Sequence, residues 1–200
     1  MKRIFVAVDL PDAARNRLGE YSKALRTAFP LAPARWVEPE NMHITLHFAG
    51  SIDDGAIENL NKHVAQVAAE TGPLTVVLQK VGAFVSRRTR ANVLWIGGRS
   101  HSADEVWNVL EVAALSIQEL DGRPPRRYSP HVTLARLKKP DEAVDLISSH
   151  LNTDFEPISF EVNELVVYES ALLPTGSVYN ALSRHALLGN PSISRRDTSR

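Results

Sequence analysis

The sequence contains no cysteine, which excludes disulfide bonds and any zinc or iron–sulfur site built on thiolates. No apolar run reaches the roughly 20 residues that a membrane-spanning helix needs. The apolar run that starts at Ile4 ends at Asp9, which is too short for the core of a signal peptide. The lack of cysteine fits a reducing compartment. These absences predict a soluble, cytoplasmic protein without a membrane partner.

The protein of 200 residues also has no formal net charge, because 23 Lys and Arg residues balance 23 Asp and Glu residues. This balance argues against a broadly cationic protein that coats nucleic acid. A local basic site is still possible, since two stretches without Asp or Glu carry Lys80, Arg87, Arg88, Arg90 and Arg99, and then Arg123, Arg126, Arg127, Arg136, Lys138 and Lys139. If both stretches border one site, they form a rim that attracts phosphate.

Strand-like and helix-like patterns alternate along the chain and predict a mixed α/β (α+β) protein. We expect helices at 12–29, 57–68, 103–120 and 141–150, and strands at 4–10, 42–49, 74–85, 91–96, 128–137, 155–168 and 177–188. The two halves follow a similar order, which indicates two lobes related by pseudo-symmetry. We therefore expect one bilobal domain at 1–188 and a polar, disordered tail at 189–200.

One four-residue pattern occurs twice, as His43-Ile44-Thr45-Leu46 and as His131-Val132-Thr133-Leu134. Both copies fall in strand-like runs, where residues two apart share a face. In each copy the histidine and the threonine therefore point one way, and the aliphatic residues point the other way to the core. If a pseudo-twofold axis relates the lobes, two histidines and two threonines converge on one point.

Two imidazoles at one site suit phosphoester chemistry, because a pKa near 6.5 lets one be neutral while the other is protonated. The neutral one accepts a proton from the attacking group, and the protonated one donates a proton to the leaving oxygen. Threonine hydroxyls can donate hydrogen bonds to phosphate oxygens. We expect no metal and no cofactor, since zinc usually needs a third protein ligand. The two motifs look equivalent, so this reasoning does not say which histidine is the acid.

Together with their flanking residues, these motifs resemble the 2H phosphoesterases, and among them the bacterial and archaeal RNA 2′,3′-cyclic phosphodiesterases, historically called 2′-5′ RNA ligases. The resemblance covers most of residues 3–188. Its supporting stretches are Arg3 to Pro11, Trp36, Pro39 to His43, Val93 to Gly97, Pro130, Ala135-Arg136 and Tyr168 to Ser170.

The resemblance implies a bilobal fold in which antiparallel-rich sheets line a central cleft and helices lie outside. It also implies an enzyme that hydrolyses RNA 2′,3′-cyclic phosphate ends to 2′-phosphomonoesters, with His43 as the proton donor and His131 as the proton acceptor. The partner is then an RNA end or a small cyclic-phosphate nucleotide, and nothing in the sequence suggests more than a monomer. Two alternatives remain open: 2′-5′ RNA ligation by the same site, and a non-catalytic protein that binds RNA or nucleotides.

Several further residues bear on the substrate. The family resemblance implies that Arg136 binds phosphate, but strict alternation from His131 places it on the opposite face unless a bulge redirects it. The family often has an arginine at the position of Asn92, and Arg90, two residues earlier, is the candidate substitute. We interpret His47 as a partly exposed residue at a strand end. Trp36 could stack on a base, but packing in the core beneath its loop is favoured.

Overall fold

The computed structural model describes residues 1–85, 91–98, 105–118, 129–173 and 176–189. The α-helices of this part are α1 (Asp12–Ala28), α2 (Asp54–Glu70), α3 (Glu105–Gln118) and α4 (Val144–Leu151), with short 3-10 helices η1 (Pro39–Asn41) and η3 (Pro140–Glu142). The strands are β1 (Lys2–Asp9), β2 (Ala34–Trp36), β3 (His43–Ile52), β4 (Leu74–Leu78), β5 (Lys80–Val85), β6 (Ala91–Gly97), β7 (His131–Leu137), β8 (Ile158–Val162), β9 (Glu164–Leu173) and β10 (Gly176–Ala186).

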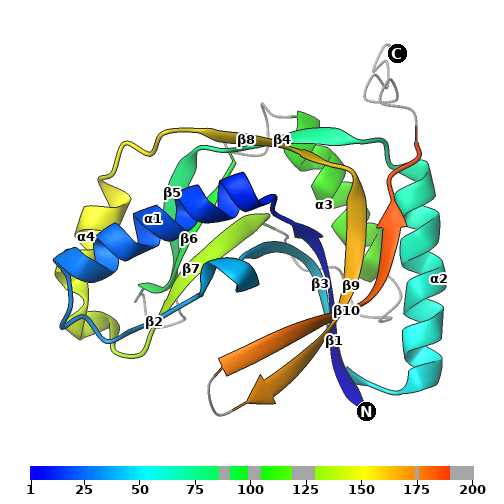
Figure 1. The fold of residues 1–200 in the computed structure, drawn as a ribbon, viewed down its shortest axis with the longest axis horizontal. Helices are drawn as coiled ribbons and strands as arrows, with labels where there is room; N and C mark the ends of the chain where they lie inside the picture. The colour runs from blue at the N-terminus through cyan, green and yellow to red at the C-terminus, as the bar shows by residue number, and fades with distance from the viewer. Residues whose placement is uncertain (86–90, 99–104, 119–128, 174–175, 190–200) are drawn as a thin grey trace.

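An antiparallel sheet forms the centre of the molecule, with the strand order β10-β9-β1-β3-β7-β6-β5, and β2 pairs with β7. Strands β4 and β8 form a separate two-stranded sheet. Helices α2 and α3 pack against β10 and β3 respectively, and α4 packs against β5 (Figure 1). The mixed α/β class with antiparallel sheets is therefore confirmed.

Each side of the large sheet contains strands from both halves of the chain. Strands β5 and β6 belong to the first half but lie on the β7 side, whereas β9 and β10 belong to the second half but lie on the β1 side (Figure 1). The two sides are therefore not consecutive halves of the sequence. The expected single strands at 74–85 and 155–168 are each divided in two, at Gln79 and Asn163, where the chain passes between the two sheets.

Local sequence explains where the main helices begin and what they bury. Helix α1 follows Pro11 and buries Leu18, Ser22 and Leu25 on one side, as its apolar spacing predicts. Helix α2 begins after Asp53, whose carboxylate accepts a hydrogen bond of 2.9 Å from the backbone N–H of Ala56. This N-cap satisfies a backbone donor that has no partner within the helix.

The C-terminal end of the described chain is attached to the end of α2. The backbone N–H of Gly189 donates to the carbonyl of Thr71 at 3.0 Å. The rest of the expected tail, residues 190–200, lies outside the described residues. In the part of the chain that the structure describes, no helix combines the length and the apolar character that crossing a membrane requires.

Candidate active site

Strands β3 and β7, which carry the two His-x-Thr motifs, lie side by side in the middle of the large sheet. Ile44 and Val132 are direct antiparallel partners, and both are fully buried. Continuing this register by one residue each way places His43 opposite Thr133 and Thr45 opposite His131. All four polar side chains are half-buried and share the face opposite to Ile44 and Val132.

Each motif strand contains a β-bulge directly after its threonine. On β3 the register with β1 jumps from Thr45 to His47, and on β7 the register with β6 jumps from Thr133 to Ala135. The leucine of each motif is the extra residue, and it is buried together with the residue that follows it. The matched bulges show that the pseudo-symmetry of the motifs extends to their backbone geometry.

The bulge in β7 brings Arg136 to the face of the two histidines. Leu134 and Ala135 both point into the core, which shifts the alternation by one position and leaves Arg136 exposed. The prediction from strict alternation, which placed Arg136 away from the site, is therefore wrong. A strand pattern read from sequence assumes an unbroken period of two, and a bulge interrupts it.

The corresponding bulge in β3 turns the side chain of His47 toward the core. Its side chain is 5% exposed and lies on the core side with Leu46, so it is neither in the site nor a partly exposed strand-end residue. Phe48, the next residue, takes the position on the open face that Arg136 has on β7, and it is 50% exposed.

Backbone carbonyls orient both catalytic candidates in the same way. The Nδ1–H of His43 donates to the carbonyl of Asn41 at 2.8 Å, and the Nδ1–H of His131 donates to the carbonyl of Ser129 at 2.6 Å. With Nδ1 used as the donor, Nε2 carries the lone pair of the neutral ring and is the atom that can exchange a proton. The hydroxyl of Thr45 donates to Nε2 of His43 at 2.9 Å in that neutral state.

Aromatic side chains enclose each imidazole. The ring of His43 lies 4.9 Å from that of Phe5 and 5.3 Å from that of Tyr179, and His131 lies 4.6 Å from Phe84. These contacts remove water from both rings. Burial consequently lowers the pKa of His43 and of His131 below the ordinary value of 6.5, because it disfavours the charged imidazolium. The hydrogen bonds to Asn41 and Ser129 oppose this effect.

Nearby positive charges affect the protonation of both rings. The positive charge of Arg136 lowers the pKa of both histidines, and a charge on His131 also lowers the pKa of His43. The two imidazoles therefore discourage each other from being protonated at the same time. This coupling makes the doubly protonated state less favourable relative to the two states with a single proton.

Asp9 distinguishes the two histidines, which look equivalent in sequence. It is the direct partner of His43 across β1 and β3, and its negative charge raises the pKa of His43. The position that faces His131 is Gly97, which carries no charge. Asp9 accepts a hydrogen bond of 2.6 Å from the hydroxyl of Tyr168, and burial together with this bond raises the pKa of Tyr168 to about 12. Tyr168 therefore stays a neutral donor.

The other candidates have mixed outcomes. Arg90 lies outside the described residues, as do six more of the eleven basic residues of the two acid-free stretches: Arg87, Arg88, Arg99, Arg123, Arg126 and Arg127. Trp36 packs in the smaller core beneath helix α1, with Leu25 and Ala135, as favoured from sequence. Among the described residues, no group of three or more His, Cys, Asp or Glu side chains could hold a metal ion.

Sequence reasoning missed Asp9, because it ends an ordinary strand and belongs to no motif. It also missed strand β2 and the role of His150. His150 is fully buried, accepts a hydrogen bond of 2.9 Å from the hydroxyl of Tyr21, and donates to the carbonyls of Gly82 and Trp95. No local signal separates such a histidine from one on a helix surface.

Comparisons with known proteins identify relatives of this chain. The sequence profile of the family described as "LigT like Phosphoesterase" matches residues 8–95 and 108–179, which include both motifs. A Thermotoga maritima protein named RNA 2′,3′-cyclic phosphodiesterase is 29% identical over 187 residues, covering 90% of this chain and 92% of that protein. A Methanocaldococcus jannaschii protein of the same name is 26% identical over 183 residues, covering 90% and 98%.

The fold was also compared with solved structures. The crystal structure of E. coli LigT in its apo form superimposes with a TM-score of 0.69 at 24% identity, covering 93% of this chain and 97% of that chain. At this identity the likeness concerns the fold. The overall fold is therefore shared with E. coli LigT.

Proposed function

Since the chain belongs to the LigT like Phosphoesterase family, we propose that it hydrolyses RNA 2′,3′-cyclic phosphate ends to 2′-phosphomonoesters, using two histidines and no metal ion. The names of its relatives support the substrate class. The observation that carries the proposal is the direct pairing of Ile44 with Val132, which brings His43 and His131 to one face of adjacent strands.

In the proposed reaction, Nε2 of neutral His131 takes a proton from a water molecule, and the oxygen of that water attacks the phosphorus atom. The bond between phosphorus and the 3′ oxygen breaks. Nε2–H of protonated His43 delivers its proton to that oxygen, so the products are a 3′ hydroxyl and a 2′ phosphate. General acid–base catalysis of this kind contributes about 10²–10⁴-fold for each group.

The remaining polar groups act on the phosphate oxygens. The hydroxyls of Thr45 and Thr133 donate hydrogen bonds to the non-bridging oxygens, on which negative charge increases in the transition state. Arg136 offers a planar fork of N–H donors to the same group. The negative charge of Asp9 supports His43 as the proton donor, because it favours the imidazolium form at that position.

The test uses an RNA oligonucleotide that ends in a 2′,3′-cyclic phosphate, with EDTA in the buffer. We expect conversion to the 2′-phosphate product at a rate that EDTA does not change. His43→Ala and His131→Ala should each lower kcat by about 10²–10⁴-fold. His63→Ala is the control for loss of an imidazole elsewhere, since His63 contacts the carbonyl of Ser116 on another helix.

Other outcomes separate the alternatives. Unchanged activity in either site variant contradicts the two-histidine mechanism, and activity that EDTA abolishes contradicts independence from metal. A 2′-5′ joined product from RNA with a 5′ hydroxyl end identifies ligation by the same site. Binding that weakens with salt, without turnover, identifies a protein that only binds RNA.

A further inference from the structure

Strand β2 brings a second arginine next to Arg136. This short strand pairs with β7 so that Arg35 is the direct antiparallel partner of Arg136. Directly opposed residues share a face of the sheet, with Cβ atoms about 4.5–5.5 Å apart. The two guanidinium groups therefore extend from neighbouring positions.

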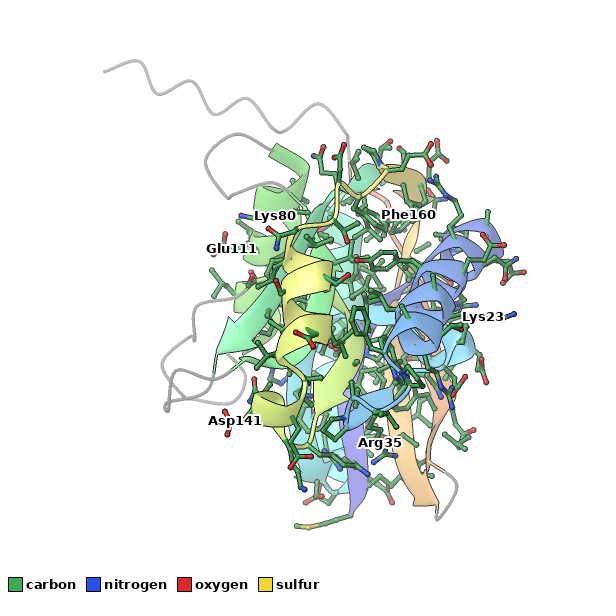
Figure 2. The ribbon with its side chains drawn as sticks, turned by 90° about the vertical axis from the view of Figure 1, so that its left-hand side faces the viewer. Lys23, Arg35, Lys80, Glu111, Asp141 and Phe160 are labelled. Carbon is green, nitrogen blue, oxygen red and sulfur yellow. The ribbon has the colours of Figure 1, made fainter. Side chains whose placement is uncertain are left out.

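Core packing confirms the direction of both side chains. On β2, Ala34 and Trp36 pack against the smaller core, and on β7, Ala135 and Leu137 are buried in the same cluster. The residue between each pair must point to the other face. Arg35 and Arg136 are accordingly exposed, on the face that carries the histidines. Figure 2 labels Arg35 below helix α1.

The two arginines lie directly opposite each other, and no carboxylate of the described residues forms a salt bridge with either of them. Like charges directly opposite each other destabilise a strand pair. Within the described residues, neither Arg35 nor Arg136 forms a salt bridge, although eight other ion pairs occur there. Two unpaired guanidinium groups side by side are suited to an anion with several oxygens, and phosphate matches their planar donor forks.

The two arginines differ in their relation to the catalytic centre. The positive charge of Arg136 lowers the pKa of His43 and of His131. Arg35 lies on β2, which pairs with β7 beyond the Ile44–Val132 pair, so Arg35 stands beside Arg136 and not beside the motif residues. A phosphate at Arg35 is distinct from the one that reacts between the histidines.

We propose that Arg35, beside Arg136, binds the internucleotide phosphate on the 5′ side of the terminal nucleotide, so that the enzyme prefers oligonucleotide ends to mononucleotides. This inference rests on the proposed function. The arrangement provides a row of donors along one sheet face, in which Arg136 reaches the reacting phosphate and Arg35 reaches the next one. A mononucleotide without a 5′ phosphate has no group for Arg35 to bind.

The test compares two substrates in the wild type and in Arg35→Gln. One is a dinucleotide that ends in a 2′,3′-cyclic phosphate, and the other is a 2′,3′-cyclic mononucleotide without a 5′ phosphate. We expect kcat/KM for the dinucleotide to fall about 10-fold or more, as for loss of a charge-assisted hydrogen bond, and kcat/KM for the mononucleotide to change less than twofold. The slope of log kcat/KM against log salt for the dinucleotide should become less steep by about 0.7.

Arg26→Gln is the matched control, because Arg26 is an exposed arginine in the last turn of helix α1. It should leave both substrates unaffected. An equal loss on both substrates in Arg35→Gln overturns the proposal, since Arg35 would then serve the reacting phosphate. No loss on either substrate overturns it as well. The melting temperature of Arg35→Gln should equal or exceed that of the wild type, because a like-charge pair is removed.

A failure of the proposed function is distinguishable from a failure of this subsite. If the wild type turns over neither substrate, binding of a labelled single-stranded RNA hexamer with a terminal 2′ phosphate still tests the subsite by fluorescence anisotropy. Weaker binding of Arg35→Gln than of Arg26→Gln supports it. Equal binding by the two variants refutes it.

Discussion

Ile44 and Val132 face each other across β3 and β7 at the centre of the large sheet, 88 positions apart in the chain. This one pair brings the histidine and the threonine of each motif to one face of the sheet. Histidine and threonine flank it on each strand, the backbone carbonyls of Asn41 and Ser129 orient the rings, and matched bulges follow on both strands. The pairing of β3 with β7 thus places both imidazoles on one face of the sheet.

The first prediction concerns Asp9. Asp9→Asn removes the negative charge opposite His43, so the pKa of His43 should fall further below 6.5, whereas the pKa of His131, which has Gly97 opposite it, should not fall. Proton NMR titration of the histidine Cε1–H signals measures both. Tyr168→Phe is the control, because it removes the hydrogen bond to Asp9 and leaves the carboxylate charge in place. Equal midpoints for His43 in the wild type and in Asp9→Asn would contradict the assigned role.

The pH dependence of activity follows from the two lowered pKa values. The kcat/KM profile reports the free enzyme and should be bell-shaped, with its maximum on the acid side of pH 6.5, because burial lowers the pKa of both histidines. The kcat profile should lie at higher pH, since a bound phosphate anion stabilises the imidazolium and raises its pKa. Initial rates between pH 4.5 and 8.5 test this. A single sigmoid in kcat/KM would count against a pair of titrating groups.

His150 should make the fold sensitive to acid. Burial lowers its pKa below 6.5, so below that pH the unfolded chain binds a proton that the folded chain excludes. The free energy of unfolding must therefore decrease as the pH falls from 6.5 toward the lowered pKa. His150→Gln should lose about 2 kcal/mol at pH 7.5, because the bonds to Tyr21 and to two carbonyls are disturbed.

The same variant should lose less additional stability on acidification than the wild type. Urea unfolding at pH 7.5 and pH 5.5 measures the difference for each protein. An identical decrease in both would show that His150 does not contribute to the acid sensitivity. His43, His131 and His185 also have lowered pKa values and account for the decrease that remains in the variant.

The ring of Trp95 leaves no space for a side chain at Gly82. A Cβ atom at this position would lie 2.1 Å from the Trp95 ring, which in turn contacts Phe84 and lies 6.2 Å from the ring of His131. Gly82→Ala should lower the free energy of unfolding by about 1–3 kcal/mol and reduce kcat, because Trp95 must move.

Gly55→Ala provides the control for this glycine substitution. Gly55 lies in the first turn of α2, where an added Cβ meets only Asp53 at an ordinary 3.5 Å. It should stabilise the protein by up to about 1 kcal/mol, through the higher helix propensity of alanine. Thermal unfolding of both variants compares them. Equal stability of Gly82→Ala and the wild type would mean that the Trp95 ring has space to move.

The predictions that the structure confirms rest on patterns among residues that are close together in the sequence. The 3.6-residue spacing in α1 and the alternation in the first residues of β3 and β7 are local patterns, and each element buries the face that its pattern indicates. The repeated His-x-Thr-Leu was visible for the same reason. The bulges were not, because a register shift depends on the partner strand and leaves no mark in the residue pattern.

The sequence by itself determined which side chains are the candidates for the proposed chemistry, since two histidines and two threonines in a repeated strand motif are a property of the chain alone. Only the tertiary structure decided what surrounds them. It brought Asp9 beside His43 but Gly97 beside His131, mixed strands from both halves of the chain in one sheet, turned Arg136 toward the site and set Arg35 next to it. Strand pairing joins residues far apart in the chain, and its register depends on the packing of whole sheets, which no local pattern contains.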